Sequence, residues 1–198
     1  MNKSLKEVPK EIILATTNKG KKSEFESLCE GTGILIKNIE QPFECEETGD
    51  SFIENATQKA KLAAKITRSY CIADDSGLCV ESMNGEPGIY SARFFNNGAG
   101  MIKIIEALRN CVNRNAFFVC ALVLASSEGR VLWQTEKKWE GTISQKPLGN
   151  NGFGYDPIFI PNGYSQTAGE LDENVKKEIS HRAKSILSFK EFFLSLNN

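Results

Sequence analysis

The sequence predicts an α/β protein built on a mixed sheet flanked by helices. In the first half of the chain, short apolar stretches alternate with amphipathic ones, which predicts strands that are parallel at least in part and joined by helices. Further on, two long apolar stretches are separated by a tight polar turn, which predicts a β-hairpin. No repeat, low-complexity segment or linker is visible. We therefore expect one domain over residues 1–198, with residues 1–10 as an N-terminal extension.

Each expected element is recognised by its apolar period and by the residues at its ends. Expected strands are short apolar runs, and expected helices carry an apolar stripe and begin at a polar cap or end at glycine. The long helix, for example, follows a cap at Asp50 or Ser51. Polar or glycine-rich stretches at 40–50, 84–88 and 149–159 are expected to be loops and turns. In chain order we expect a strand at 11–17, a helix at 19–30, a strand at 34–39, a helix from the cap to 67, a strand at 69–80, a helix at 99–110, a hairpin within 116–143 and a helix at 180–196.

Composition and charge exclude several classes of protein. Lys and Arg number 24 against 25 Asp and Glu, a net charge of −1, which argues against a protein that coats nucleic acid or an acidic membrane. No apolar run is long enough for a signal peptide or a membrane span. Six cysteines without CxxC spacing and a single histidine predict reduced, mostly buried thiols rather than a zinc site. We expect a cytoplasmic protein.

Two adjacent acids, Asp74 and Asp75, interrupt the apolar strand SYCIADDSGLCV. A buried carboxylate is costly unless it is paired, hydrogen-bonded or bound to a metal. Asp75 precedes Ser76 at the carboxyl end of the strand, where ligands of open α/β sheets bind. With Glu46 or Glu47 from the preceding loop, it could hold Mg2+ beside phosphates. The alternatives are helix capping by the loop acids and salt bridges for the strand acids. Alternation places Asp74 on the opposite face, in a structural role.

Two further stretches carry candidate chemistry. TTNKGKK (16–22) joins a strand to a helix, where backbone N–H groups and Lys21 could receive phosphate, although a solvated helix start is the alternative. ISHRAKS (179–185) holds the only histidine beside an arginine, and no triad accompanies it. An anion-binding turn, lysines and paired carboxylates together indicate metal-assisted attack of water on a phosphate.

Six segments, spread from residue 15 to residue 185, match a known family in its order. The chain resembles the inosine/xanthosine triphosphate pyrophosphatases in ATTNKGK, EETGDSFIENATQKA, IADDSGLCV, GEPGIYSARF, GFGYDPIF and ISHRAKS. The resemblance implies an elongated fold of two lobes with a central nucleotide cleft, and a homodimer. It also implies Mg2+-dependent hydrolysis of ITP, dITP and XTP to the monophosphate and pyrophosphate, which keeps these nucleotides out of DNA and RNA.

The resemblance also assigns roles to individual residues. Asp75 and Lys21 would be catalytic, with Asp75 accepting a proton from water. The metal ligands would be Asp75 and Glu47 or Glu46. Implied substrate contacts are Thr16, Thr17, Asn18, Lys19, Gly20, Lys21 and Lys59 for the phosphates, Ser76, and Phe153, Gly154, Tyr155, Asp156, Lys176, His181 and Arg182 for the base. Thr17 stands where many relatives have glycine, which restricts the backbone of the phosphate turn.

Base selection gives the sharpest expectation from the sequence. Arginine has donors and no acceptor, so Arg182 would favour a 6-oxo purine over adenine, and its loss should flatten the preference for ITP over ATP. Two other functions are open: a pyrophosphatase for modified pyrimidine or 7-methylguanine nucleotides, and a catalytically silent nucleotide-binding protein. Intact Asp75, Glu47 and Lys21 count against the silent protein.

Overall fold

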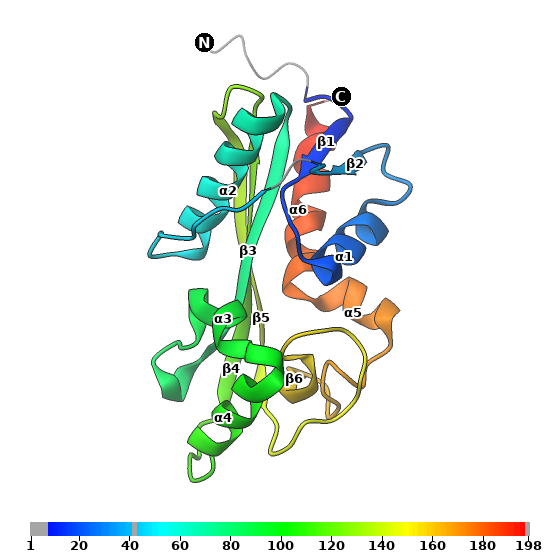
Figure 1. Cartoon of the computed structure of the whole chain (residues 1–198). Helices are drawn as coiled ribbons and strands as arrows, with labels where there is room; N and C mark the ends of the chain where they lie inside the picture. The colour runs from blue at the N-terminus through cyan, green and yellow to red at the C-terminus, as the bar shows by residue number, and fades with distance from the viewer. Residues whose placement is uncertain (1–7, 41–42, 197–198) are drawn as a thin grey trace. The chain divides into compact units, whose positions relative to one another are not determined.

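The structure is a computed structural model that describes residues 8–40 and 43–196 (Figure 1). Most of the expected N-terminal extension, residues 1–7, lies outside the described residues, as do positions 41 and 42 of the loop expected at 40–50.

A mixed six-stranded sheet runs through the described chain in the order β2-β1-β3-β4-β5-β6. β1 is parallel to both β2 and β3, whereas β5 is antiparallel to β6. This confirms the predicted α/β class and its partly parallel sheet. The strands are β1 (Glu11–Leu14), β2 (Leu35–Asn38), β3 (Cys71–Val80), β4 (Asn115–Ala125), β5 (Val131–Ile143) and β6 (Phe159–Pro161).

The helices follow the sheet connections and begin at identifiable caps. Asn18 caps α1 by accepting from the Lys21 N–H at 3.0 Å, and Ser51 caps α2 by accepting from the Glu54 N–H. α2 ends at Thr67 and is followed by Arg68, which adopts a left-handed conformation with φ of 51°. The α-helices are α1 (Lys19–Cys29), α2 (Phe52–Thr67), α3 (Ser91–Phe95), α4 (Ala99–Ala107), α5 (Glu173–Ile179) and α6 (His181–Ser195).

The chain divides into two compact units whose boundaries fall inside strands. Of the described residues, unit 1 comprises 8–40, 43–75, 120–137 and 182–196, and unit 2 comprises 76–119 and 138–181. The boundaries interrupt β3 after Asp75, β4 before Cys120 and β5 after Lys137. Each of these three strands therefore contributes residues to both units.

Unit 1 packs helices on both faces of its strands. In Figure 1, α2 covers one face, and α1 and α6 lie across the other. Phe25 of α1 and Phe189 of α6 are fully buried against Ile12, Leu14 and Ile72 of the strands. Burial on both faces explains why residues 12–14 of β1 and 71–73 of β3 are apolar runs rather than alternating ones. On α2 the buried face is mostly alanine, which lets the helix lie close to the sheet.

Unit 2 has its own core around aromatic side chains. Trp139 and Phe159 pack on each other with ring centroids 5.0 Å apart, among Leu78, Ile104 and other buried side chains. Arg114 ties two backbone segments together by donating to the carbonyls of Leu108, Ile143 and Ser144, each at 2.7 Å. These bonds hold the loop after β5 to the end of α4.

Most predicted elements are confirmed, with shifted ends. The strand expected at 11–17 stops at Leu14, because residues 15–18 lead into the cap of α1. The hairpin is confirmed by neighbouring β4 and β5, whose turn is closed by the Ser126 N–H bonded to the Arg130 carbonyl. The sequence did not predict α3, α5 or β6, which are three to seven residues long. The predicted two lobes with a central cleft concern the placement of one unit against the other and stay a prediction.

All six cysteines are free thiols, and four of them are buried, as the spacing predicted. Burial raises the pKa of Cys29 to about 11 and that of Cys120 to about 12, so both stay protonated at neutral pH. Within residues 8–40 and 43–196, no helix combines the length and the hydrophobicity that a membrane span needs.

Candidate active site

The two adjacent acids of β3 bind different partners in unit 1. Asp75 contacts side chains of α2, whereas Asp74 contacts side chains of α1 and α6. These helices lie on opposite faces of the strands (Figure 1). The alternation predicted from the sequence is confirmed, and each carboxylate has its own hydrogen-bond partners.

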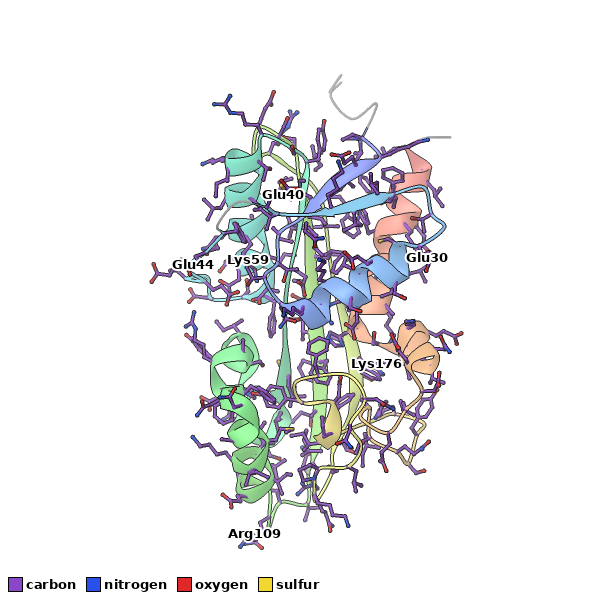
Figure 2. All side chains as sticks on the ribbon, turned by 45° about the vertical axis from the view of Figure 1, so that its right-hand side comes forward. Glu30, Glu40, Glu44, Lys59, Arg109 and Lys176 are labelled. Carbon is purple, nitrogen blue, oxygen red and sulfur yellow. The ribbon has the colours of Figure 1, made fainter. Side chains whose placement is uncertain are left out.

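Asp75 lies at the centre of a buried polar cluster on the α2 side. Lys59 extends from α2 (labelled in Figure 2), and its Nζ lies 3.4 Å from Asp75 Oδ1 and 2.8 Å from Glu47 Oε1. Asn55, one turn earlier on α2, donates its amide N–H to Asp75 Oδ2 at 3.1 Å. The side chains of Asp75 and Lys59 are 6% and 11% exposed. One ammonium therefore bridges the two carboxylates that were predicted to hold a metal.

Burial and the opposite charges act against each other in this cluster. Burial raises the pKa of Asp75 above its usual range, although Lys59 and Lys21 work to lower it. Burial also disfavours the charged form of Lys59, but Asp75, Asp74 and Glu47 keep its pKa above the ordinary value. Asp75 therefore has the stronger basicity expected of a proton acceptor, next to an ammonium that stays charged.

Asp74 joins the first helix to the last one in a second charged cluster. Its Oδ2 lies 3.1 Å from Lys21 Nζ and 3.2 Å from an Arg182 guanidinium nitrogen. The other terminal nitrogen of Arg182 pairs with Glu24 of α1. Burial alone would raise the pKa of Asp74, but Lys21 and Arg182 hold it well below its usual range. Burial likewise opposes the charge on Arg182, whose pKa Asp74 and Glu24 keep above its usual value.

The turn before α1 presents a helix N-terminus beside this cluster. The Asn18 N–H donates to Thr16 Oγ1 at 3.2 Å, and the Asn18 side chain caps the Lys21 N–H. Asn18 and Lys19 are exposed, and Gly20 is half-buried. The amides at the start of a helix have no intrahelical acceptor and favour an anion. Lys21 adds a positive charge that is only 15% exposed and is already oriented by Asp74.

Unit 2 contains a separate polar cluster in the glycine-rich turn. Asp156, 3% exposed, accepts from Lys176 Nζ at 2.6 Å and from the Phe153 backbone N–H at 2.8 Å. The Lys176 ammonium also lies over the Phe153 ring, 5.1 Å from its centroid. Gly152 has φ of 73°, and a Cβ there would come within 2.1 Å of Asp156 Oδ2. Only glycine fits this turn while the ion pair is kept.

The remaining predicted substrate contacts of unit 2 differ in their surroundings. Tyr155 is buried, and its hydroxyl donates to the Ser91 carbonyl at 2.8 Å. His181 stacks on Phe118 with ring centroids 4.7 Å apart and an interplanar angle of 7°. Gly154 has φ of 63° with open space around it. Ser76 follows Asp75 in β3 and is half-buried.

The donors around Asp75 fit a hard divalent cation. Two carboxylates from separate segments lie on one cation already, and Mg2+ commonly uses one or two carboxylates together with phosphate and water. Of the two loop acids, Glu47 reaches this cluster and Glu46 is exposed. The described residues contain no group of three or more His, Cys, Asp or Glu that could hold a metal by themselves. Completing the coordination would therefore fall to oxygens from outside the chain.

Sequence reasoning missed three residues of these clusters. Asn55, Glu24 and Gly152 each contact a predicted site residue directly. The spacing of Asn55 and Lys59, four residues apart on one helix face, is a signal that could have identified Asn55. Glu24 pairs with Arg182, which is distant in sequence, and Gly152 lies close to Asp156 only because of the geometry of one turn. Neither contact leaves a comparable signal in the sequence.

Comparisons with known proteins identify the family of this chain. The model of the Ham1 family matches residues 12–192. This chain belongs to the Ham1 family. A dITP/XTP pyrophosphatase of Nautilia profundicola is 43% identical over 94% of this chain and 99% of its own, and one from Legionella pneumophila strain Paris is 45% identical over 89% and 95%. A HAM1 protein structure from Coxiella burnetii, 37% identical, superposes with a TM-score of 0.83 over 93% of this chain and 98% of that one. The resemblance stated from the six motifs is confirmed.

Proposed function

We propose that this Ham1-family protein is a nucleoside triphosphate pyrophosphatase that hydrolyses ITP, dITP and XTP to the monophosphate and pyrophosphate. The observation that carries the proposal is the pair of carboxylates, Asp75 and Glu47, bridged by the Lys59 ammonium. Relatives that match almost the whole chain are named dITP/XTP pyrophosphatases, which supports the substrate class.

Glu47 and Asp75 would hold Mg2+. When bound, the ion would neutralise phosphate charge and lower the pKa of a coordinated water. Glu47 is the better second ligand than Glu46, because its carboxylate already shares a cation with Asp75. Lys59 then has a second role: its ammonium balances the two carboxylates and can move to the triphosphate, since its flexible stem allows that shift.

The phosphates would bind at the start of α1. Residues 16–20 offer backbone N–H groups at a helix N-terminus, and Lys21 contributes a charge that Asp74 orients. Asp74 itself keeps Arg182 as a partner when Lys21 turns to the triphosphate. This arrangement binds every triphosphate alike, because the phosphate chain is common to all of them.

Asp75 would accept the proton of the attacking water. In the reaction, the water oxygen bonds to phosphorus, the anhydride between the α and β phosphates breaks, and pyrophosphate leaves. Burial raises the pKa of Asp75, which strengthens it as a base. Asn55 holds the other Asp75 oxygen at 3.1 Å and so limits rotation of the carboxylate. Ser76, the next residue of β3, would contact the substrate.

The base would be recognised by Phe153, Asp156 and Lys176, with Gly154 and His181 contributing. Phe153 can stack on a purine, and Lys176 is a donor suited to a 6-oxo group. Tyr155 would act through its bond to the Ser91 carbonyl, which holds the turn. Arg182 stays a predicted reader of the 6-oxo group, although its terminal nitrogens already bind Glu24 and Asp74. Reading the base would require it to exchange one of these ion pairs.

The experiment that tests this function is pyrophosphate release from ITP, dITP, XTP, GTP, ATP, modified pyrimidine triphosphates and 7-methyl-GTP, with and without Mg2+. We expect turnover of the first three only, and its loss on chelation. Asp75→Asn keeps the side-chain volume but removes a ligand charge and the base, so kcat should fall by about 100-fold or more. Preference for a modified pyrimidine or 7-methyl-GTP would favour the broader pyrophosphatase, and no turnover of any substrate would favour the silent binding protein.

Three further expectations are part of the same proposal. We propose a homodimer, a cytoplasmic location, and a biological role in keeping non-canonical purines out of DNA and RNA, with no nucleic-acid or membrane partner. The near-neutral net charge of −1 supports the absence of a nucleic-acid partner. Sedimentation of the purified protein measures the dimer directly.

A further inference from the structure

Asn55 is a buried amide to which the sequence assigned no role. It lies in the first half of α2 and is 1% exposed. Its Nδ2 donates to Asp75 Oδ2 at 3.1 Å, and its Oδ1 accepts from the Gly49 backbone N–H at 2.8 Å. Since a carboxylate only accepts and a backbone N–H only donates, the two partners fix the orientation of the amide.

The first partner determines how the Asp75 carboxylate is oriented. Asn55 binds Oδ2, and Lys59, one helical turn further along α2, contacts Oδ1. The two residues are four positions apart and share a helix face. One rigid helix therefore holds both oxygens of Asp75, so the carboxylate cannot turn without breaking a contact to α2.

The second partner belongs to the loop that carries the other acid. Gly49 is two residues after Glu47, and a Cβ at Gly49 would lie 2.9 Å from Asn55 Oδ1 and 2.7 Å from the Glu54 Cβ. The absence of a side chain at Gly49 thus permits the close approach. Through one amide, Asn55 links the backbone next to Glu47 to the carboxylate of Asp75.

We propose that Asn55 is a positioning residue that sets the separation and orientation of Glu47 and Asp75, and thereby their affinity for a divalent cation. The inference rests on the proposed function for the assignment of these two acids as metal ligands. Hydrogen bonds to ligating carboxylates commonly change metal affinity by about 10- to 100-fold. An asparagine is otherwise unfavourable inside a helix, and at this position both ends of its amide are used.

Binding of Mn2+ to the full-length protein without nucleotide, followed by the EPR signal of free Mn2+, tests the proposal directly. In Asn55→Ala the dissociation constant for Mn2+ should rise about tenfold, and at least about threefold. The Mg2+ concentration for half-maximal turnover should rise in parallel. An Asn55→Ala protein that melts earlier but binds Mn2+ within about threefold of the unaltered protein would overturn the proposal.

Two more variants keep the test decisive. Gly49→Ala disturbs the same link from the loop side and should also weaken Mn2+ binding. If Asn55→Ala does not fold, unchanged binding in Gly49→Ala overturns the proposal.

Gln58→Ala is the matched control, because Gln58 also lies on α2 and accepts from Thr48 of the loop, at 3.3 and 3.4 Å. Since these long, exposed bonds do not involve Asp75, Gln58→Ala should bind Mn2+ like the unaltered protein. Loss of binding in Gln58→Ala equal to that in Asn55→Ala would overturn the role of the Asp75 contact.

Asp75→Asn separates failure of this inference from failure of the proposed function. If Asp75→Asn loses Mn2+ binding and turnover while Asn55→Ala keeps both, only the role of Asn55 is wrong. If Asp75→Asn keeps Mn2+ binding and turnover, the metal pair itself is wrong, and the inference fails with it.

Discussion

Asp74 and Asp75 are neighbours in the chain, yet their environments give them different chemistry. Two cations hold the pKa of Asp74 well below its usual range, so it stays ionised as an anchor for Lys21 and Arg182. Burial raises the pKa of Asp75, which accepts from the Lys59 ammonium and from the neutral Asn55 amide. Environments that push the pKa values of two carboxyls apart are the usual basis of a division of labour in hydrolases.

Arg182 can be tested for base recognition separately from its structural ion pairs. If it reads the 6-oxo group, Arg182→Ala should lower kcat/KM for ITP more than for ATP and reduce their ratio by about tenfold, the scale of one unpaired polar group. Steady-state kinetics with both nucleotides measures the ratio. Equal losses for ITP and ATP would leave Arg182 only its structural role.

Arg182→Lys is the matched control for this comparison. It keeps a positive charge beside Asp74 and Glu24 but lacks the guanidinium fork. Removing one member of a buried ion pair costs about 3–5 kcal/mol, so Arg182→Ala should also lower the melting temperature. The lysine variant should recover much of that stability without restoring the full ITP preference.

At the scale of elements, the sequence predicted what depends on local patterns. The cap at Ser51 and the small-residue face of α2 are readable from the chain, and α2 was found at almost its observed length. α5 was missed because seven residues are too few for a clear helical period, although Asp172 caps it by accepting from the Asn174 N–H. The bond from Asn55 to Asp75 joins residues twenty positions apart, so no local pattern indicates it.

The turn at residues 152–156 has no room for a methyl group at Gly152, which gives a testable prediction. In Gly152→Ala the added Cβ would displace the Asp156 carboxylate from Lys176 and from the Phe153 N–H. If these residues hold the base, kcat/KM for ITP should fall about tenfold or more, as expected when a substrate is misplaced. Steady-state kinetics, with circular dichroism to verify folding, provides the measurement.

Gly163→Ala separates the steric effect from backbone strain. Gly163 also has a positive φ, 85°, but a Cβ there meets nothing within 4 Å. Both variants should therefore lose about 1 kcal/mol of stability from the left-handed conformation. Only Gly152→Ala should lose activity, and an equal loss in Gly163→Ala would attribute the effect to strain.

For the whole molecule, the sequence predicted the family and the α/β class but not the positions at which the chain divides into two units. Family motifs such as IADDSGLCV are local, and they were sufficient to predict the family and the α/β class. The unit boundaries fall inside β3, β4 and β5, and each strand continues across its boundary. A boundary within a continuous strand leaves no local signal, since the strand residues on either side satisfy the same pattern.

Strands shared between the units predict that the protein unfolds in one cooperative step. Unfolding either unit removes part of β3, β4 and β5 from the other, so an intermediate with one folded unit should be unstable. The two tryptophans allow a direct measurement, because they lie in different units. Trp133 packs against Phe189 and Phe192 in unit 1, and Trp139 packs against Phe118 and Phe159 in unit 2.

Single-tryptophan variants can therefore report on each unit during urea unfolding. Trp139→Phe leaves fluorescence from Trp133 alone, and Trp133→Phe leaves fluorescence from Trp139 alone. In each variant we expect the fluorescence midpoint to coincide with the midpoint from far-ultraviolet circular dichroism of that same variant, which cancels any destabilisation by the substitution. A fluorescence midpoint clearly separated from the circular dichroism midpoint in either variant would show that the units unfold independently, and that the expected single domain is two.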